Sequence, residues 1–99
     1  MAHIDNENDS VIRNRCLAAI GDEGGDGELL FFEGLDAAII GVGSMAGGGH
    51  RVVYDRQRCI ELLEALVTEN AEEYFEHNVE TGYIGSATPL FLTWIRNEA

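Results

Sequence analysis

The feature that most constrains this chain is a glycine-rich stretch, GVGSMAGGGH (41–50), placed between two apolar segments. It begins with Gly41-x-Gly43-x-x-Ala46, the letters of the turn that binds a dinucleotide pyrophosphate. That turn needs a helix to start within it, because the helix amides and the helix dipole hold the phosphates. Residues 47–49 are instead three more glycines, and each destabilises a helix by about 1 kcal/mol relative to alanine. The stretch therefore favours a wide, mobile hairpin loop that contacts a partner over a nucleotide site.

Short apolar runs on both sides of this loop predict the strands of a small sheet. We expect strands near residues 29–32, 36–43, 51–54 and 90–95. The last run starts after Pro89, which suits the first position of an edge strand because proline cannot donate a ladder hydrogen bond. The chain is also too short for the several βαβ units of a dinucleotide-binding fold. The sequence therefore predicts a small antiparallel sheet of about three or four strands.

Three segments with apolar residues at helical spacing predict helices. The first spans residues 10–20, the second runs from a capping Asp55 to residue 68, and the third spans residues 70–80. Asn70 and Glu73 have the spacing of a capping box at the start of the third helix. We expect the second and third helices on one face of the sheet and the first packed alongside, in an α+β domain. Residues 1–9 are expected to be a disordered acidic tail, and residues 10–99 a single globular domain.

The residues that carry chemistry do not form a recognisable catalytic or metal-binding set. Cys16 and Cys59 fall on apolar helix faces and predict buried, reduced thiols. The three histidines lack the spacing of metal ligands, and the abundant carboxylates lie on helix faces where nothing would tune them for acid–base work. We therefore expect no enzyme, no cofactor and no metal site. No apolar run approaches the ~20 residues that cross a bilayer, so we expect no membrane segment and a cytoplasmic protein.

The charge composition points to a kind of partner. The chain has 18 acidic residues against six basic ones, all of them arginine, for a net charge of −12. Such a charge repels phosphate backbones, so we expect no direct nucleic-acid binding. It favours a basic protein partner, although solubility or a salt-rich cytoplasm would also explain it. The candidate partner-binding residues form the outer face of the third predicted helix: Glu69, Glu72, Glu73, Glu76 and Glu80.

Asn78 stands out on the inner face of the same predicted helix, beside Tyr74 and Phe75, where an apolar residue is expected. A buried amide must find partners or line a pocket. We favour a tether that hydrogen-bonds the backbone of the turn after the helix. The alternative is a small-molecule pocket that Asn78 shares with the glycine loop. The residues of this candidate loop contact or pocket are Gly43, Gly47, Gly48, Gly49, His50, Asn78 and Tyr83.

An ordered series of short motifs runs through residues 29–92. They are EGLDAAIIG (33–41), VYD (53–55) followed by Cys59 and Ile60, EYF (73–75) with Asn78, GYIG (82–85) and TPLF (88–91). The series resembles a group of small proteins of uncharacterised function that bacteriophages and prophages encode. This chain departs from the group by its triple glycine and by the short link between its second and third predicted helices. The resemblance implies a phage accessory protein in the host cytoplasm, and it implies no particular activity, cofactor or catalytic residue.

Together these features predict a non-enzymatic phage protein that binds and inhibits a basic host factor. We expect an antidefence protein, similar to an anti-CRISPR, whose acidic face occupies the basic surface of a nucleic-acid-binding defence complex. Two alternatives stay open. One is a homo-oligomer that sequesters a small molecule such as a nucleotide, and the other is a salt-adapted structural or regulatory subunit.

Overall fold

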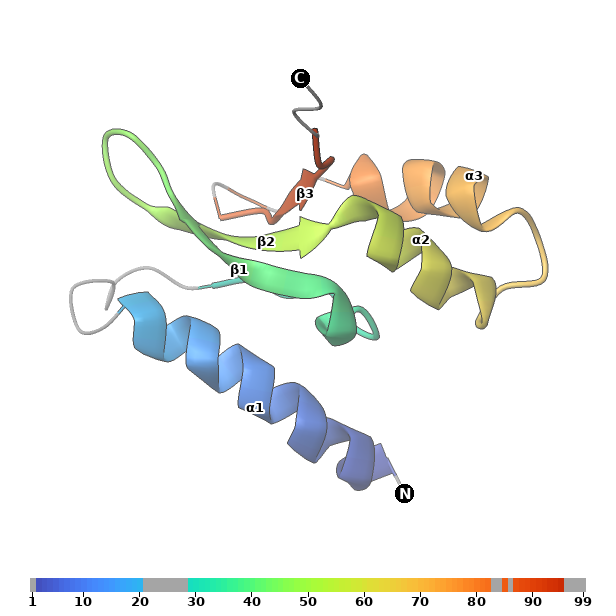
Figure 1. The fold of residues 1–99 in the computed structure, drawn as a ribbon, viewed down its shortest axis with the longest axis horizontal. Coiled ribbons are helices and arrows are strands. Elements are labelled where there is room, and N and C mark those ends of the chain that lie inside the picture. The colour runs from blue at the N-terminus through green and yellow to red at the C-terminus, as the bar shows by residue number, and fades with distance from the viewer. Residues whose placement is uncertain (1, 21–28, 83–84, 86, 96–99) are drawn as a thin grey trace.

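The fold is an α+β domain built on a small sheet (Figure 1). The computed structural model describes residues 2–20, 29–82, 85 and 87–95. The elements of this part follow one another as α1 (Ala2–Ile20), a 3₁₀ helix (Asp36–Ala38), β1 (Ile39–Ser44), β2 (His50–Asp55), α2 (Arg56–Glu64), α3 (Ala71–Phe75), a π-helix (Glu76–Glu80) and β3 (Leu90–Leu92).

The predicted α+β class is confirmed, whereas the sheet is mixed and not purely antiparallel as predicted. Strands β1 and β2 pair antiparallel, as a hairpin requires, whereas β3 pairs parallel to β2 at the edge of the sheet. The parallel pairing follows from the connection, because α2 and α3 carry the chain back across the sheet before β3 begins. The two helices thus form the crossover of a βαβ unit, which the strand spacing in the sequence did not indicate.

The prediction of a strand at residues 29–32 is wrong. This segment contributes side chains to the core without joining the sheet. The backbone N–H of Phe32 donates to the hydroxyl oxygen of Tyr54 at 2.8 Å, so a side chain satisfies a group that a strand would have paired. The next expected strand begins later than predicted, at Ile39, because residues 36–38 form a 3₁₀ turn.

Helices α2 and α3 begin where their capping residues predicted. The Asp55 carboxylate accepts from the N–H of Arg58 at 3.2 Å, and the Asn70 side chain accepts from the N–H of Glu73 at 3.0 Å. Helix α2 is shorter than predicted, since it ends at Glu64. Helix α1 extends back to Ala2, over the segment expected to be a tail, and a helix that has already formed is extended at little cost per residue.

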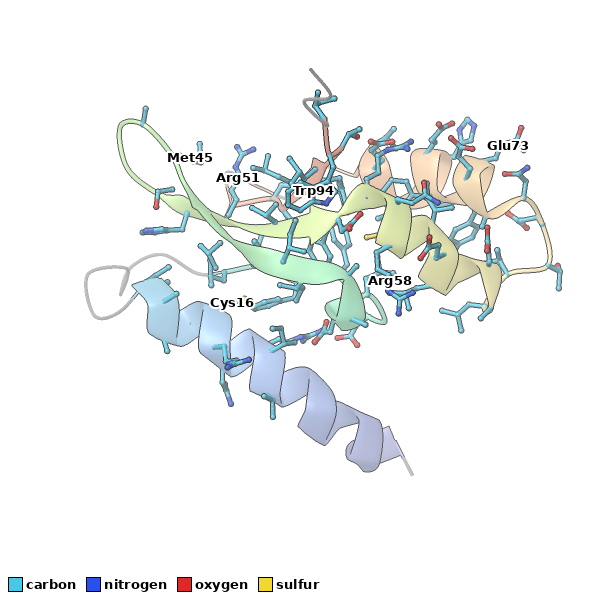
Figure 2. All side chains as sticks on the ribbon, viewed as in Figure 1. Cys16, Met45, Arg51, Arg58, Glu73 and Trp94 are labelled. Atoms are coloured by element: carbon cyan, nitrogen blue, oxygen red, sulfur yellow. The ribbon has the colours of Figure 1, made fainter. Side chains whose placement is uncertain are left out.

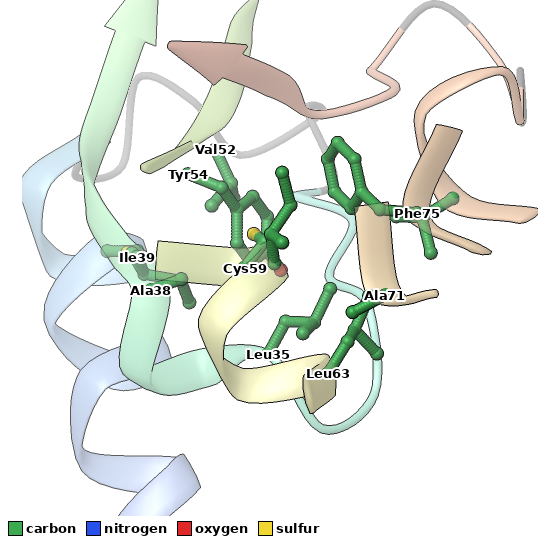
Figure 3. Close-up of a cluster of buried hydrophobic side chains, with 12 residues drawn as sticks. Leu35, Ala38, Ile39, Val52, Tyr54, Cys59, Leu63, Ala71 and Phe75 are labelled. Atoms are coloured by element: carbon green, nitrogen blue, oxygen red, sulfur yellow. The ribbon is translucent and has the colours of Figure 1, made fainter. Parts of the chain in front are cut away.

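The core lies where β2, α2 and α3 meet (Figure 3). Its largest fully buried side chains are Tyr54, Phe75, Val52 and Cys59. Phe91 from β3 completes an aromatic cluster, with its ring centroid 4.9 Å from that of Phe75 and 5.6 Å from that of Tyr54. Both cysteines are free and buried, which confirms the prediction for Cys16 and Cys59. The core therefore joins residues from both strand pairings and from the crossover helices.

A buried ion pair attaches α1 to the rest of the domain. The Arg13 guanidinium donates to both carboxylate oxygens of Asp36, at 2.6 and 3.0 Å, and Asp36 is only 4% exposed. These hydrogen bonds raise the pKa of Arg13 above its ordinary value. The same guanidinium lies 4.9 Å from the ring centroid of Phe31. Two charges and an aromatic ring thus hold the helix at this point.

Candidate partner-binding site

The helical part of the crossover carries an excess of negative charge. Residues 56–82 contain seven glutamates and two arginines, which is a net charge of −5. Helices α2 and α3 pack against each other, so these charges share one region of the molecule (Figure 2). Most of the glutamates are exposed, with Glu76 half-buried. They are Glu61, Glu64, Glu69, Glu72, Glu73, Glu76 and Glu80.

The two arginines of this region are bound by its own glutamates. Arg56 donates to Glu80 at 2.9 Å and to Glu76 at 3.2 Å, and its guanidinium lies 5.2 Å from the ring centroid of Phe75. The hydrogen bond to Glu80 raises the pKa of Arg56 above its ordinary value. Arg58 donates to Glu61 at 3.3 Å. No cation of this region is therefore left over to neutralise the remaining glutamates.

The predicted acidic face consequently has two parts. Glu76 and Glu80 are engaged by Arg56, which sequence spacing alone did not indicate. Glu69, Glu72 and Glu73 are exposed, and within the described part of the chain none of them forms an ion pair. We call these three residues the acidic surface. It lies around the start of α3, where the Glu73 backbone is held by the Asn70 cap.

A pocket of about 260 Å³ lies beside the charged helices, between the start of α2 and the end of β3. Trp94 forms part of its wall and is 62% exposed, yet its indole N–H donates to the Asp55 carboxylate at 3.2 Å. Arg56 lines the same pocket. Its ion pairs with Glu76 and Glu80 connect the pocket to the π-helix that follows α3. The lining residues are Asp55, Arg56, Gln57, Leu92, Thr93 and Trp94.

The glycine stretch forms a narrow turn rather than a wide loop. Gly43 lies within β1, paired with Arg51, and His50 is the first residue of β2, paired with Ser44. The connection is closed by two backbone hydrogen bonds, from the Met45 N–H to the Gly49 carbonyl at 3.0 Å and from the Gly48 N–H to the Met45 carbonyl at 2.9 Å. The sequence predicts that the first strand of the hairpin ends at residue 43, whereas the ladder also pairs Ser44 with His50, so the loop is shorter than expected.

The three consecutive glycines are explained by backbone conformation. Residues 47, 48 and 49 have φ values of 92°, 111° and 99°, in the region where other residues are strained. We expect Gly48→Ala to lower the free energy of unfolding by about 1 kcal/mol. The matched control is Gly41→Ala, because Gly41 has no positive φ and its Cβ would meet open space. Urea unfolding of the two variants measures the difference, and equal stabilities would contradict this account of the turn.

Asn78 is not on the buried face of the helix, contrary to the sequence prediction. It is exposed, and its amide donates to the Tyr74 carbonyl of its own helix at 3.1 Å rather than to the turn that follows. The π-helix explains the error: its wider turn keeps Phe75 and Val79 facing the core and rotates Asn78 away from it. Tyr83 lies outside the described residues.

The structure does not bring together the residues of the predicted small-molecule pocket. The tip of the β1–β2 hairpin extends from one end of the molecule, away from the π-helix that carries Asn78 (Figure 1). A different hollow of about 240 Å³ adjoins β1 on the side of α1. Among the described residues that line it, Arg15 is the charged one, and the others are apolar residues of α1 and β1: Ile12, Cys16, Ala19, Ile39, Ile40, Gly41 and Val42.

Sequence reasoning missed Trp94 and Arg56 as members of a site. The sequence predicts Trp94 within an edge strand over residues 90–95, whereas β3 ends at Leu92. Its 62% exposure depends on where β3 ends, which the apolar run did not indicate. Arg56 gave no signal, because its partners Glu76 and Glu80 are more than a helix away in the sequence.

Comparisons with protein-family models, with curated proteins and with solved structures return no match. Among the described helices, none combines the length and the apolar character needed to cross a bilayer.

Proposed function

We propose that this chain is a non-enzymatic accessory protein of a bacteriophage or prophage that binds a basic host protein and inhibits it. The acidic surface (Glu69, Glu72 and Glu73) faces the partner, at a site where the partner otherwise holds nucleic acid. The target is a host defence complex, and the protein acts in the host cytoplasm as an anti-CRISPR-like antidefence factor.

The observation that carries this proposal is the internal neutralisation of the arginines in the helical region. Arg56 and Arg58 are each engaged by glutamates, so the acidic surface keeps its full charge. Exposed like charges close together are unfavourable in the free protein, and a basic partner removes that repulsion on binding. The same charge repels nucleic acid and a second copy of this chain.

A small-molecule function is the weaker alternative because its candidate residues lie apart. The hairpin tip that carries the glycines extends away from the π-helix that carries Asn78 (Figure 1). In the part of the chain that the structure describes, the hollow between α1 and β1 offers Arg15 as its cation, where a nucleotide would need several groups to hold its phosphates.

Charge reversal at the acidic surface tests the proposal. We expect Glu72→Lys to weaken binding to the host partner by about tenfold, because it places a cation against a basic surface. The control is Glu33→Lys, which changes the net charge by the same amount at an exposed position outside the helical region. The measurement is capture of the partner from host lysate, followed by titration of the purified partner with each variant.

Duplex DNA or RNA added as a competitor distinguishes binding at the nucleic-acid site of the partner from nonspecific binding elsewhere on it. We expect nucleic acid to displace this protein from its partner, since both occupy one basic surface. Equal binding by Glu72→Lys and Glu33→Lys, or a complex that nucleic acid does not affect, would contradict the proposal.

A further inference from the structure

Trp94 is an exposed aromatic side chain held in a defined orientation. It is 62% exposed, and its indole N–H donates to one carboxylate oxygen of Asp55 at 3.2 Å. The other oxygen of that carboxylate accepts from the backbone N–H of Arg58. The N-terminal cap of α2 therefore also orients the indole, and a partner that stacks on the ring does not have to immobilise it first.

The surroundings of Trp94 are apolar and open. Leu92 lines the same pocket of about 260 Å³, and Leu90 on the same strand is 42% exposed. Ile95, the next residue after Trp94, is 85% exposed. Tryptophan with aliphatic neighbours at an exposed strand end is typical of a protein-binding surface, where buried aromatic anchors supply most of the affinity.

The charges at the pocket favour a cationic occupant. Among the described residues that line it, Arg56 is the positive one and Asp55 the negative one, and the Arg56 guanidinium is already bound by Glu76 and Glu80 outside the lining. An anion therefore meets no unengaged cation among these residues, whereas a cation is attracted to the Asp55 carboxylate and to the face of the indole.

We propose that this pocket receives an arginine side chain of the basic partner, stacked on the indole of Trp94. The proposal rests on the function proposed above and names the anchor of that interface. Arginine fits better than lysine, because its planar guanidinium stacks on an aromatic face and loses less hydration than an ammonium group. A second copy of this chain is a poor occupant, because each copy carries a net charge of −12.

The single tryptophan of the chain supplies a direct readout of this pocket. We expect tetra-arginine amide to change the emission of Trp94 in a saturable way, and we expect tetra-citrulline amide, which has the same shape without the charge, to leave it unchanged. A response that does not saturate below roughly 10 mM, or an equal response to both peptides, would overturn the proposal.

Substitutions at Trp94 test whether the pocket contributes to binding of the intact partner protein. We expect Trp94→Ala to weaken partner binding about tenfold, measured by calorimetry. The control is Leu66→Ala, another exposed apolar residue, which lies after α2 and outside the pocket. Circular dichroism verifies that both variants fold, and Trp94→Phe, which keeps an aromatic face, is expected to fall between Trp94→Ala and the unaltered protein.

The outcomes distinguish failure of this proposal from failure of the proposed function. If Glu72→Lys weakens partner binding and Trp94→Ala does not, the acidic surface binds the partner and the arginine pocket is wrong. If no basic partner exists while tetra-arginine still saturates the Trp94 signal, the pocket stands and the proposed function falls. If neither variant affects binding, both are wrong.

Discussion

Replacing Arg13 with alanine is expected to destabilise the protein by about 3 kcal/mol. The substitution leaves the carboxylate of Asp36, which is 4% exposed, without the two hydrogen bonds that compensate its burial. The free-energy cost of leaving a buried charge unpaired exceeds the net stabilisation that the ion pair provided. The reason is that hydrogen bonds no longer offset the desolvation of the carboxylate. Helix α1 also loses the contact of the guanidinium with the Phe31 ring.

Urea unfolding followed by circular dichroism measures the loss, and hydrogen exchange locates it. We expect the amides of α1 to exchange faster in Arg13→Ala than in the unaltered protein, since this pair joins α1 to the segment before β1. Arg15→Ala is the matched control, because Arg15 is an exposed arginine of the same helix. Equal stabilities of the two variants would show that the ion pair does not hold α1.

Raising the pH above 9 is expected to destabilise the protein. By about pH 11 we expect the free energy of unfolding to fall by an amount on the order of 4 kcal/mol. Burial and the nearby Asp55 charge raise the pKa of the Cys59 thiol from 9.0 to about 12. Burial raises the pKa of Tyr54 from 10.0 to about 12. In both cases the folded state holds the proton more tightly than the unfolded state. Stability is therefore full below pH 9 and is lost as the pH rises towards 12.

The contribution of Cys59 can be separated from that of other groups. We expect Cys59→Ala to be less stable than the unaltered protein near neutral pH, because it leaves a small cavity. Between about pH 9 and pH 11 the free energy of unfolding of Cys59→Ala should fall by less than half as much as that of the unaltered protein. The reason is that the variant lacks the thiol, which has a larger pKa change than Tyr54. Urea unfolding across this range provides the curves. Parallel curves for the two proteins would contradict the assignment to Cys59.

The caps and strands show which parts of the fold were predictable. Asp55 and Asn70 act within three residues of their partners, so spacing along the chain was enough to place the starts of α2 and α3. The β1–β2 hairpin was predictable for the same reason, since glycines and flanking apolar runs are neighbours in the sequence. Local chemistry decided these elements.

The errors fall where a distant partner or a change of helix type decides the outcome. Residues 29–32 have the letters of a strand, and the Tyr54 hydroxyl satisfies the Phe32 amide instead. Regular α-helical spacing predicts a buried Asn78, and the π-helix alters that spacing. For the candidate site, the exposure of Glu69, Glu72 and Glu73 was predictable, whereas the pairing of Glu76 and Glu80 with Arg56 was not.

The sequence by itself determined the α+β class, the starts of α2 and α3, the buried cysteines and the strongly acidic character, because each depends on composition or on contacts between near neighbours. Only the tertiary structure decided that β3 returns parallel to β2, that Arg13 and Arg56 are bound by acidic residues far along the chain, and that Trp94 is exposed beside Asp55. These features depend on which segments the core brings together, and side-chain burial sets that arrangement without leaving a periodic pattern in the sequence.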